Sequence, residues 1–157
     1  MNRGQLEHLS SVLLELHKVL IDSVKTSYER ERGQVSNPFE LLRLLTSDPF
    51  FDWLRPLSRM LADFDELLER TGPLTDAELG SVASEVRSLL EPSDEVPTTF
   101  SERYLVALQE QPAVILAHGK VSRALATMPL RVPASPTLSQ LLAAHRAAQA
   151  ARRGRRN

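Results

Sequence analysis

The four histidines are the side chains best suited to chemistry in this 157-residue chain, because imidazole titrates near neutral pH and binds metal ions. Di-metal sites in helical bundles place a glutamate three residues before a histidine, and no histidine here has that neighbour. None is followed four residues later by another histidine or an acid, which excludes the HExxH helix of zinc proteases. The chain also has no cysteine. We therefore predict no cofactor, whether metal or organic, no disulfide and no cysteine nucleophile.

Two of the histidines fall on apolar faces of expected helices. His17 lies within a leucine arc near the N-terminus, and His118 lies among Val114, Val121 and Leu125. One hypothesis is that the two rings meet across the core as a ligand-binding or proton-transfer pair. The alternative, which we favour, is that each ring packs separately and a neighbouring side chain or carbonyl satisfies its nitrogens, because buried polar groups normally find partners.

Aromatic residues gather in one part of the chain, where five of the eight lie within residues 39–64: Phe39, Phe50, Phe51, Trp53 and Phe64. Such a group most often belongs to the core, and Phe51 is expected to be the exposed or interfacial member because it falls off the main apolar stripe. The alternatives are a groove for a partner helix and a pocket for a small hydrophobic or carboxylate ligand. The candidate residues of the pocket are His17, Trp53, Phe64 and His118.

Other catalytic motifs are missing from the sequence. The six glycines are too widely spaced for a GxGxxG or Walker loop, and no GxSxG element occurs. A cluster of acidic residues is formed by Asp63, Asp65, Glu66 and Glu69. Acid–base catalysis would need a further group from a second helix, so a solvent-exposed helix face explains the cluster better. We predict that the protein is not an enzyme.

Charge is divided unevenly along the chain, although the net charge is only -1. Residues 1–110 hold 11 basic and 20 acidic side chains, a net of -9, whereas residues 111–157 hold 8 basic and no acidic ones, a net of +8. The basic part can pack on the acidic part, on a second copy of the chain or on an external acidic partner. Four terminal arginines are candidate nucleic-acid contacts: Arg152, Arg153, Arg155 and Arg156. We expect such binding to be weak, because no aromatic residues accompany them and the acidic part repels a polyanion.

Composition and periodicity predict an all-α fold. Leucine, with 27 residues, outnumbers valine and isoleucine together, with 13, and apolar residues recur at spacings of three and four. We expect a long first helix over residues 5–30, a short one over 38–46, and an aromatic-rich one over 49–70 that is kinked at Pro56.

Further helices are expected at about 76–91, 99–111, 112–127 and 138–151. Capping boxes would start the first two of these, with Thr75 paired to Glu78 and Thr99 to Glu102. Residues 91–98 form the expected loop, and a proline-rich connector precedes the last helix. These elements define one single-domain helical bundle of five to seven helices over residues 1–151, followed by a basic, disordered tail at 152–157.

No pattern in the sequence identifies a biochemical process. The first thirty residues lack a signal-peptide core, and the longest apolar run, at residues 113–117, is far too short to cross a bilayer, so we expect a cytoplasmic protein without membrane contact. The function we favour is a small, non-catalytic helical interaction or regulatory module. It would form a homodimer through an apolar face of the first or last helix, with Leu138 and Leu141 as contacts. The alanines that follow this leucine stripe would allow close packing against the partner. The alternatives are the ligand-binding bundle and the weak nucleic-acid binder.

Overall fold

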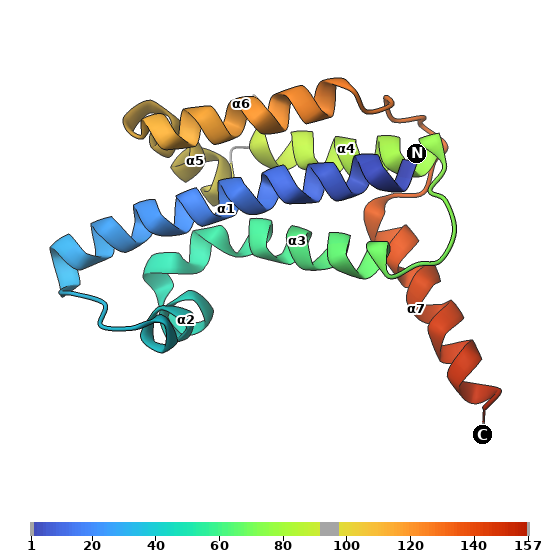
Figure 1. Cartoon of the computed structure of the whole chain (residues 1–157), viewed down its shortest axis with the longest axis horizontal. Coiled ribbons are helices and arrows are strands. Elements are labelled where there is room, and N and C mark those ends of the chain that lie inside the picture. Colours follow the sequence, from blue (N-terminus) through green and yellow to red (C-terminus); the bar gives the residue numbers. More distant parts are fainter. Residues whose placement is uncertain (1, 92–97, 157) are drawn as a thin grey trace.

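The computed structural model describes residues 2–91 and 98–156, and within these ranges the chain is helical and has no strand. The all-α bundle predicted from the sequence is therefore confirmed, with seven α-helices and one short 3-10 helix (Figure 1). The elements in chain order are α1 (Asn2–Arg32), α2 (Pro38–Ser47), η1 (Pro49–Leu54), α3 (Arg55–Leu68), α4 (Asp76–Leu90), α5 (Thr99–Glu110), α6 (Pro112–Ala126) and α7 (Leu138–Gly154).

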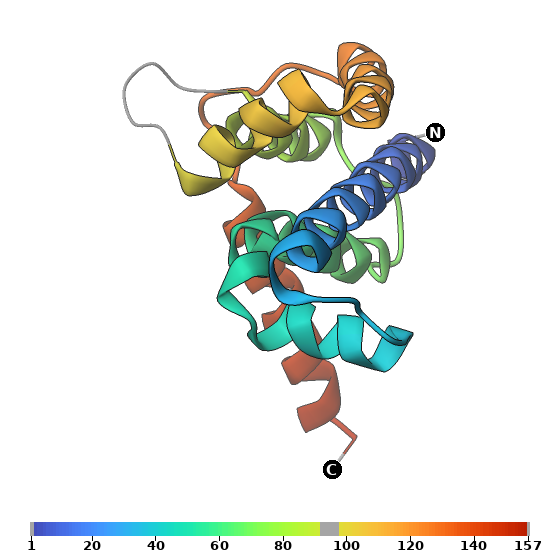
Figure 2. The same ribbon diagram turned by 90° about the vertical axis from the view of Figure 1, so that its left-hand side faces the viewer.

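Helix α1 occupies the centre of the bundle and packs against α3, α4, α6 and η1 (Figures 1 and 2). The regular leucine spacing predicted this buried face, and its residues are fully covered: Leu6, Leu9, Leu13, Leu16 and Leu20. Helix α6 runs antiparallel to α1, since Gln5 donates to the Thr127 carbonyl and Lys120 pairs with Glu15 at 2.7 Å. The Lys120 pair is one place where the basic part of the chain meets the acidic part.

The aromatic-rich segment differs from the single kinked helix that we predicted over residues 49–70. Asp48 accepts a hydrogen bond from the Phe50 amide at 2.9 Å and starts η1, and α3 begins as a separate helix at Arg55. Pro56 therefore lies in the first turn of α3, where its missing amide hydrogen breaks no helical bond. Pro56 thus lies where η1 gives way to α3, and it does not kink one continuous α-helix.

The 3-10 geometry also overturns our prediction for Phe51. A 3-10 helix turns 120° per residue, so residues three apart share a face, and Phe51 and Leu54 both point into the core. Phe51 is only 1% exposed and packs with Tyr28 and Phe50, whereas Phe39 is 84% exposed. The exposed aromatic residue is therefore Phe39.

Three helix starts show how well local capping could be predicted. The Thr75 and Glu78 box is present, and Thr137 forms a similar box with Gln140 at the start of α7. Helix α5 is capped one residue earlier than expected, because Thr98 is its N-cap and the Ser101 hydroxyl accepts from the Thr98 amide at 2.9 Å. The predicted box of Thr99 with Glu102 is thus wrong. Most of the predicted loop at 91–98 lies outside the described residues.

The connector between α6 and α7 crosses α4 at one glycine. A Cβ atom on Gly80 would lie 2.6 Å from the backbone oxygen of Leu130 and 3.2 Å from the Cα of Arg131. Real carbon and oxygen atoms do not approach that closely without displacement. Gly80 therefore allows the connector to lie against α4 and so sets where α7 begins.

Candidate functional site: the projecting half of α7

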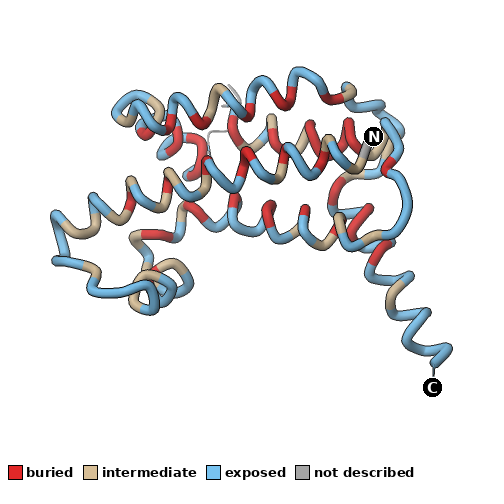
Figure 3. Tube along the Cα trace, in the orientation of Figure 1, coloured by how far each residue is buried: buried red, intermediate tan, exposed pale blue. Residues whose placement is uncertain are grey.

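Helix α7 is divided into a packed half and a projecting half. Its first two turns bury four side chains against α3 and α4: Leu138, Leu141, Leu142 and His145. Beyond Arg146 the helix extends away from the bundle, and only Gln149 is half-buried (Figures 1 to 3). We call residues 147–156 the projecting segment. The helix continues through Gly154, three residues beyond the end of the folded domain that we predicted at residue 151.

Arg146 fixes the helix where it leaves the bundle. Its Nε and Nη2 atoms donate to the two carboxylate oxygens of Glu66 at 2.7 and 2.8 Å, which is the paired geometry that suits a guanidinium. This pairing lowers the pKa of the Glu66 carboxyl. This contact with α3 therefore fixes the direction of α7 at Arg146.

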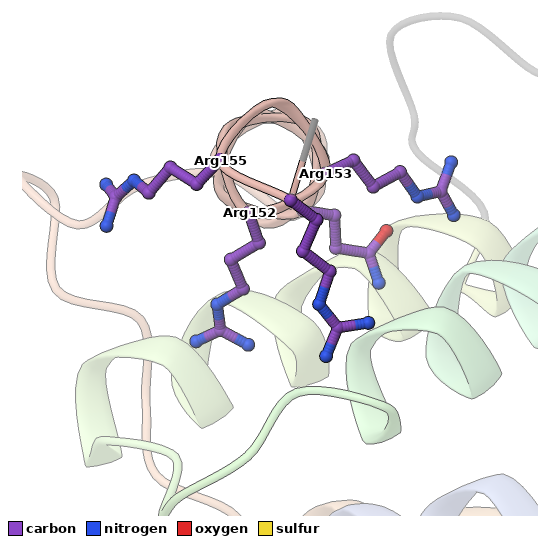
Figure 4. Close-up of a pocket in the computed structure, with 5 residues that line it drawn as sticks. Arg152, Arg153 and Arg155 are labelled. Carbon is purple, nitrogen blue, oxygen red and sulfur yellow. The ribbon is translucent and has the colours of Figure 1, made fainter.

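The four terminal arginines follow this anchor on the projecting segment. All are exposed, and none has an ion pair with a carboxylate in the described part of the chain. In the close-up, the labelled guanidinium groups of Arg152, Arg153 and Arg155 point in different directions around the helix axis (Figure 4). Cations also suit this position, because the carbonyl end of a helix is partially negative. Such a spread fits an extended acidic surface better than one small anion.

The leucine and alanine residues of α7 occupy opposite sides of the helix. At 100° per residue the buried leucines share one face. Beyond Gln140 in the first turn, the opposite face carries small, exposed residues: Ala143, Ala147, Ala150, Ala151 and Gly154. We had predicted that Leu138 and Leu141 would contact a second copy, but both are buried within the chain. The leucine face of α1 is covered in the same way, so both leucine faces are buried within the chain.

The predicted ligand-binding residues do not share one pocket. Phe64 is fully buried in the core, and Trp53 is half-buried, with its ring 5.6 Å from that of Phe100. His17 Nε2 lies 2.7 Å from the Ser58 hydroxyl on α3, whereas His118 Nδ1 lies 2.7 Å from the Tyr104 hydroxyl on α5. Across the described residues, no hydrogen bond or ring contact joins the two imidazoles. Each histidine instead has its own hydroxyl partner.

The Tyr104 hydroxyl and His118 Nδ1 are joined by a hydrogen bond of 2.7 Å between α5 and α6. Burial raises the pKa of the Tyr104 hydroxyl far above its usual range, so the phenol stays protonated. The donor in this bond depends on which nitrogen of the His118 ring carries the proton. This pair continues a row of aromatic contacts from Trp53 through Phe100, which makes it part of the packing between α5 and α6.

The lowered pKa of the His17 imidazole predicts a pH dependence of the free energy of unfolding. Burial lowers the pKa of the His17 imidazole below 6.5, so below this pH the unfolded chain binds more protons at this residue than the folded chain. The contribution of His17 to the free energy of unfolding is therefore present above pH 6.5 and is lost as the pH falls through the lowered pKa. We expect urea unfolding of His17→Gln to show a smaller loss of stability than the wild type between about pH 7.5 and 5.5. An unchanged pH dependence would show that the ring does not titrate differently on folding.

The described residues contain no group of three or more histidine and acidic residues placed to hold a metal ion. None of their helices combines the length and the apolar character that a bilayer span requires.

Comparisons of the chain with protein-family models, with curated proteins and with solved structures gave no match.

Proposed function

We propose that this protein is a non-catalytic helical interaction module, and that it self-associates through the projecting segment of α7. The observation that carries the proposal is a helix whose second half leaves the bundle with four arginines that lack a carboxylate partner in the described ranges. Its non-catalytic character is supported by the two candidate histidines, each of which is engaged by a hydroxyl at a helix interface. A cytoplasmic location belongs to the same proposal and is supported by the cysteine-free composition.

Charge favours a second copy of the chain as the partner. The acidic part of one copy, with a net of -9 over residues 1–110, complements the basic part of another, with a net of +8 over residues 111–157. The whole chain carries only -1, so two copies repel each other little at long range. A nucleic acid would instead meet the repulsion of the acidic part.

An antiparallel pair of α7 helices would bring these charges together. If a two-fold axis passes near Ala147, Arg153 of one copy lies level with Leu141 of the other, and Arg155 lies level with Ser139. The small residues of the alanine face would let the two helices approach closely, and Arg153 and Arg155 flank that face.

The opposite copy presents carboxylates at that level. Ser139 and Leu138 border a cleft of about 570 Å³ that also contains Asp63 and Glu85. Burial, together with the charge of Glu66, raises the pKa of the Asp63 carboxyl despite the opposing charges of Arg146 and Arg59. An additional guanidinium would therefore stabilise ionised Asp63. We assign Asp63 and Glu85 as the docking site for Arg153 and Arg155 of the second copy.

A charge-swap experiment tests this assignment. Sedimentation velocity of the wild type at low salt should show a dimer that dissociates as NaCl is added, because exposed charges are screened. Arg153→Glu with Arg155→Glu should be monomeric, as should Asp63→Lys with Glu85→Lys, and an equimolar mixture of the two variants should form a heterodimer. Far-ultraviolet dichroism would establish that each variant keeps its helices.

The matched control makes the same change in net charge elsewhere. Arg123→Glu with Arg131→Glu alters two exposed arginines of α6 and the connector, and this variant should still dimerise. A wild type that stays monomeric at high protein concentration and low salt would refute self-association. If that monomer bound duplex DNA in a salt-dependent way through Arg152, Arg153, Arg155 and Arg156, the nucleic-acid alternative would replace it.

A further inference from the structure

A surface cleft of about 420 Å³ lies where α1, η1 and α5 meet. Its volume is within the range typical of small-molecule sites. Its lining includes two aromatic rings, Phe50 and Trp53, and the exposed apolar side chain of Val106. Both rings are half-buried and held from behind, Phe50 by an edge-to-face contact with Tyr28 at 5.5 Å and Trp53 by Phe100 at 5.6 Å. The aromatic wall is therefore built by packing and does not depend on a ligand.

The rim of the cleft carries charged groups that are not neutralised locally. Glu31 of α1, Glu110 of α5 and Arg103 of α5 all line it, and none forms an ion pair with another residue in the described ranges. Two carboxylates and one guanidinium give the cleft a net charge of -1. Glu31 also lies in the last turn of α1, where the helix carbonyls add negative potential.

We propose that this cleft binds an organic monocation with an apolar body, such as an arylalkylamine. The ring of the ligand would lie against Phe50 and Trp53, and its ammonium group would lie between Glu31 and Glu110, where aromatic faces and carboxylates both attract a cation. Arg103 offsets one carboxylate, so a single positive charge neutralises the cleft and a second one does not. This assignment replaces the hydrophobic or carboxylate ligand that the sequence suggested. Only Trp53, among the four residues predicted for that ligand, lines this cleft, and the negative charge of the cleft disfavours a carboxylate.

The cleft contains its own spectroscopic probe, since Trp53 is the only tryptophan of the chain. We would titrate the full-length protein with 2-phenylethylammonium, and with neutral 2-phenylethanol and anionic 3-phenylpropanoate as matched probes. The ammonium compound should change the fluorescence of Trp53 saturably and bind at least about tenfold more tightly than the other two. Equal affinity for all three, or preference for the anion, would overturn the proposal.

Substitutions separate the charge effect from simple apolar contact. Glu31→Gln and Glu110→Gln should each weaken binding of 2-phenylethylammonium about fivefold, whereas Arg103→Gln should strengthen it by a similar factor. Glu102→Gln is the control, because this exposed carboxylate of α5 lies outside the cleft lining and its loss should leave the affinity unchanged. Affinity that does not respond to the two cleft glutamates would refute the assignment. The experiment is independent of self-association, because Arg153→Glu with Arg155→Glu should bind the probe as the wild type does.

Discussion

Replacing Phe51 with alanine should destabilise the protein by about 3–5 kcal/mol, the usual cost of removing a large buried aromatic side chain. Phe51 is 1% exposed, and its ring centroid lies 5.7 Å from that of Tyr28 and 6.1 Å from that of Phe50. The truncation would leave a cavity between the end of α1 and η1. Urea unfolding followed by circular dichroism measures the change.

Phe39 provides the matched control for this prediction. It lies twelve positions earlier in the same aromatic group but is 84% exposed on α2, so Phe39→Ala should change the free energy of unfolding by no more than about 0.5 kcal/mol. Similar losses at the two positions would contradict the 3-10 geometry of η1, because that geometry is what turns Phe51 inward.

Gly80→Ala should destabilise the protein by about 1–3 kcal/mol, although alanine normally favours a helix over glycine. The new Cβ would lie 2.6 Å from the Leu130 oxygen, so either the connector or α4 must move. A shift of the connector also disturbs the start of α7. Thermal unfolding should therefore show a lower melting temperature, and Gly80→Val should lower it further.

Gly119 in α6 is the corresponding control. No heavy atom lies within 4 Å of a Cβ built at this position, and the residue is inside a helix. Gly119→Ala should therefore stabilise the protein by up to about 1 kcal/mol. If Gly80→Ala stabilised it to the same extent, the connector would not rest against α4.

The parts of the fold that could be predicted from the sequence are those that depend on local chemistry. Thr75 and Glu78 form the predicted capping box, in which Thr75 accepts from the Glu78 amide at 3.1 Å, because both partners lie within one helical turn. The buried face of α1 could likewise be predicted from the regular spacing of its leucines. The error at Phe51 came from applying the α-helical angle of 100° to a 3-10 segment, and the error at Thr99 came from expecting glutamate where serine completes the box.

The candidate sites depend on tertiary packing, which the sequence does not show. Leu138 and Leu141 form an apolar stripe whether α3 and α4 or a second copy covers them, so their periodicity could not identify the partner. The sequence signal for the projecting segment is the run of alanines after that stripe, which we had expected to allow close packing against a partner. Glu31 and Glu110 belong to one cleft only because the ends of α1 and α5 converge on η1.

The central position of α1 also determines when the chain can complete its folding during synthesis. The leucines of α1 emerge early from the ribosome, but α6, which covers them, follows about a hundred residues later, as the separation of 105 residues between Glu15 and Lys120 shows. Until then the part of the leucine face that α6 covers stays exposed to solvent, and it favours aggregation or chaperone binding. Fragments that stop before α6 should therefore accumulate as insoluble or chaperone-bound material.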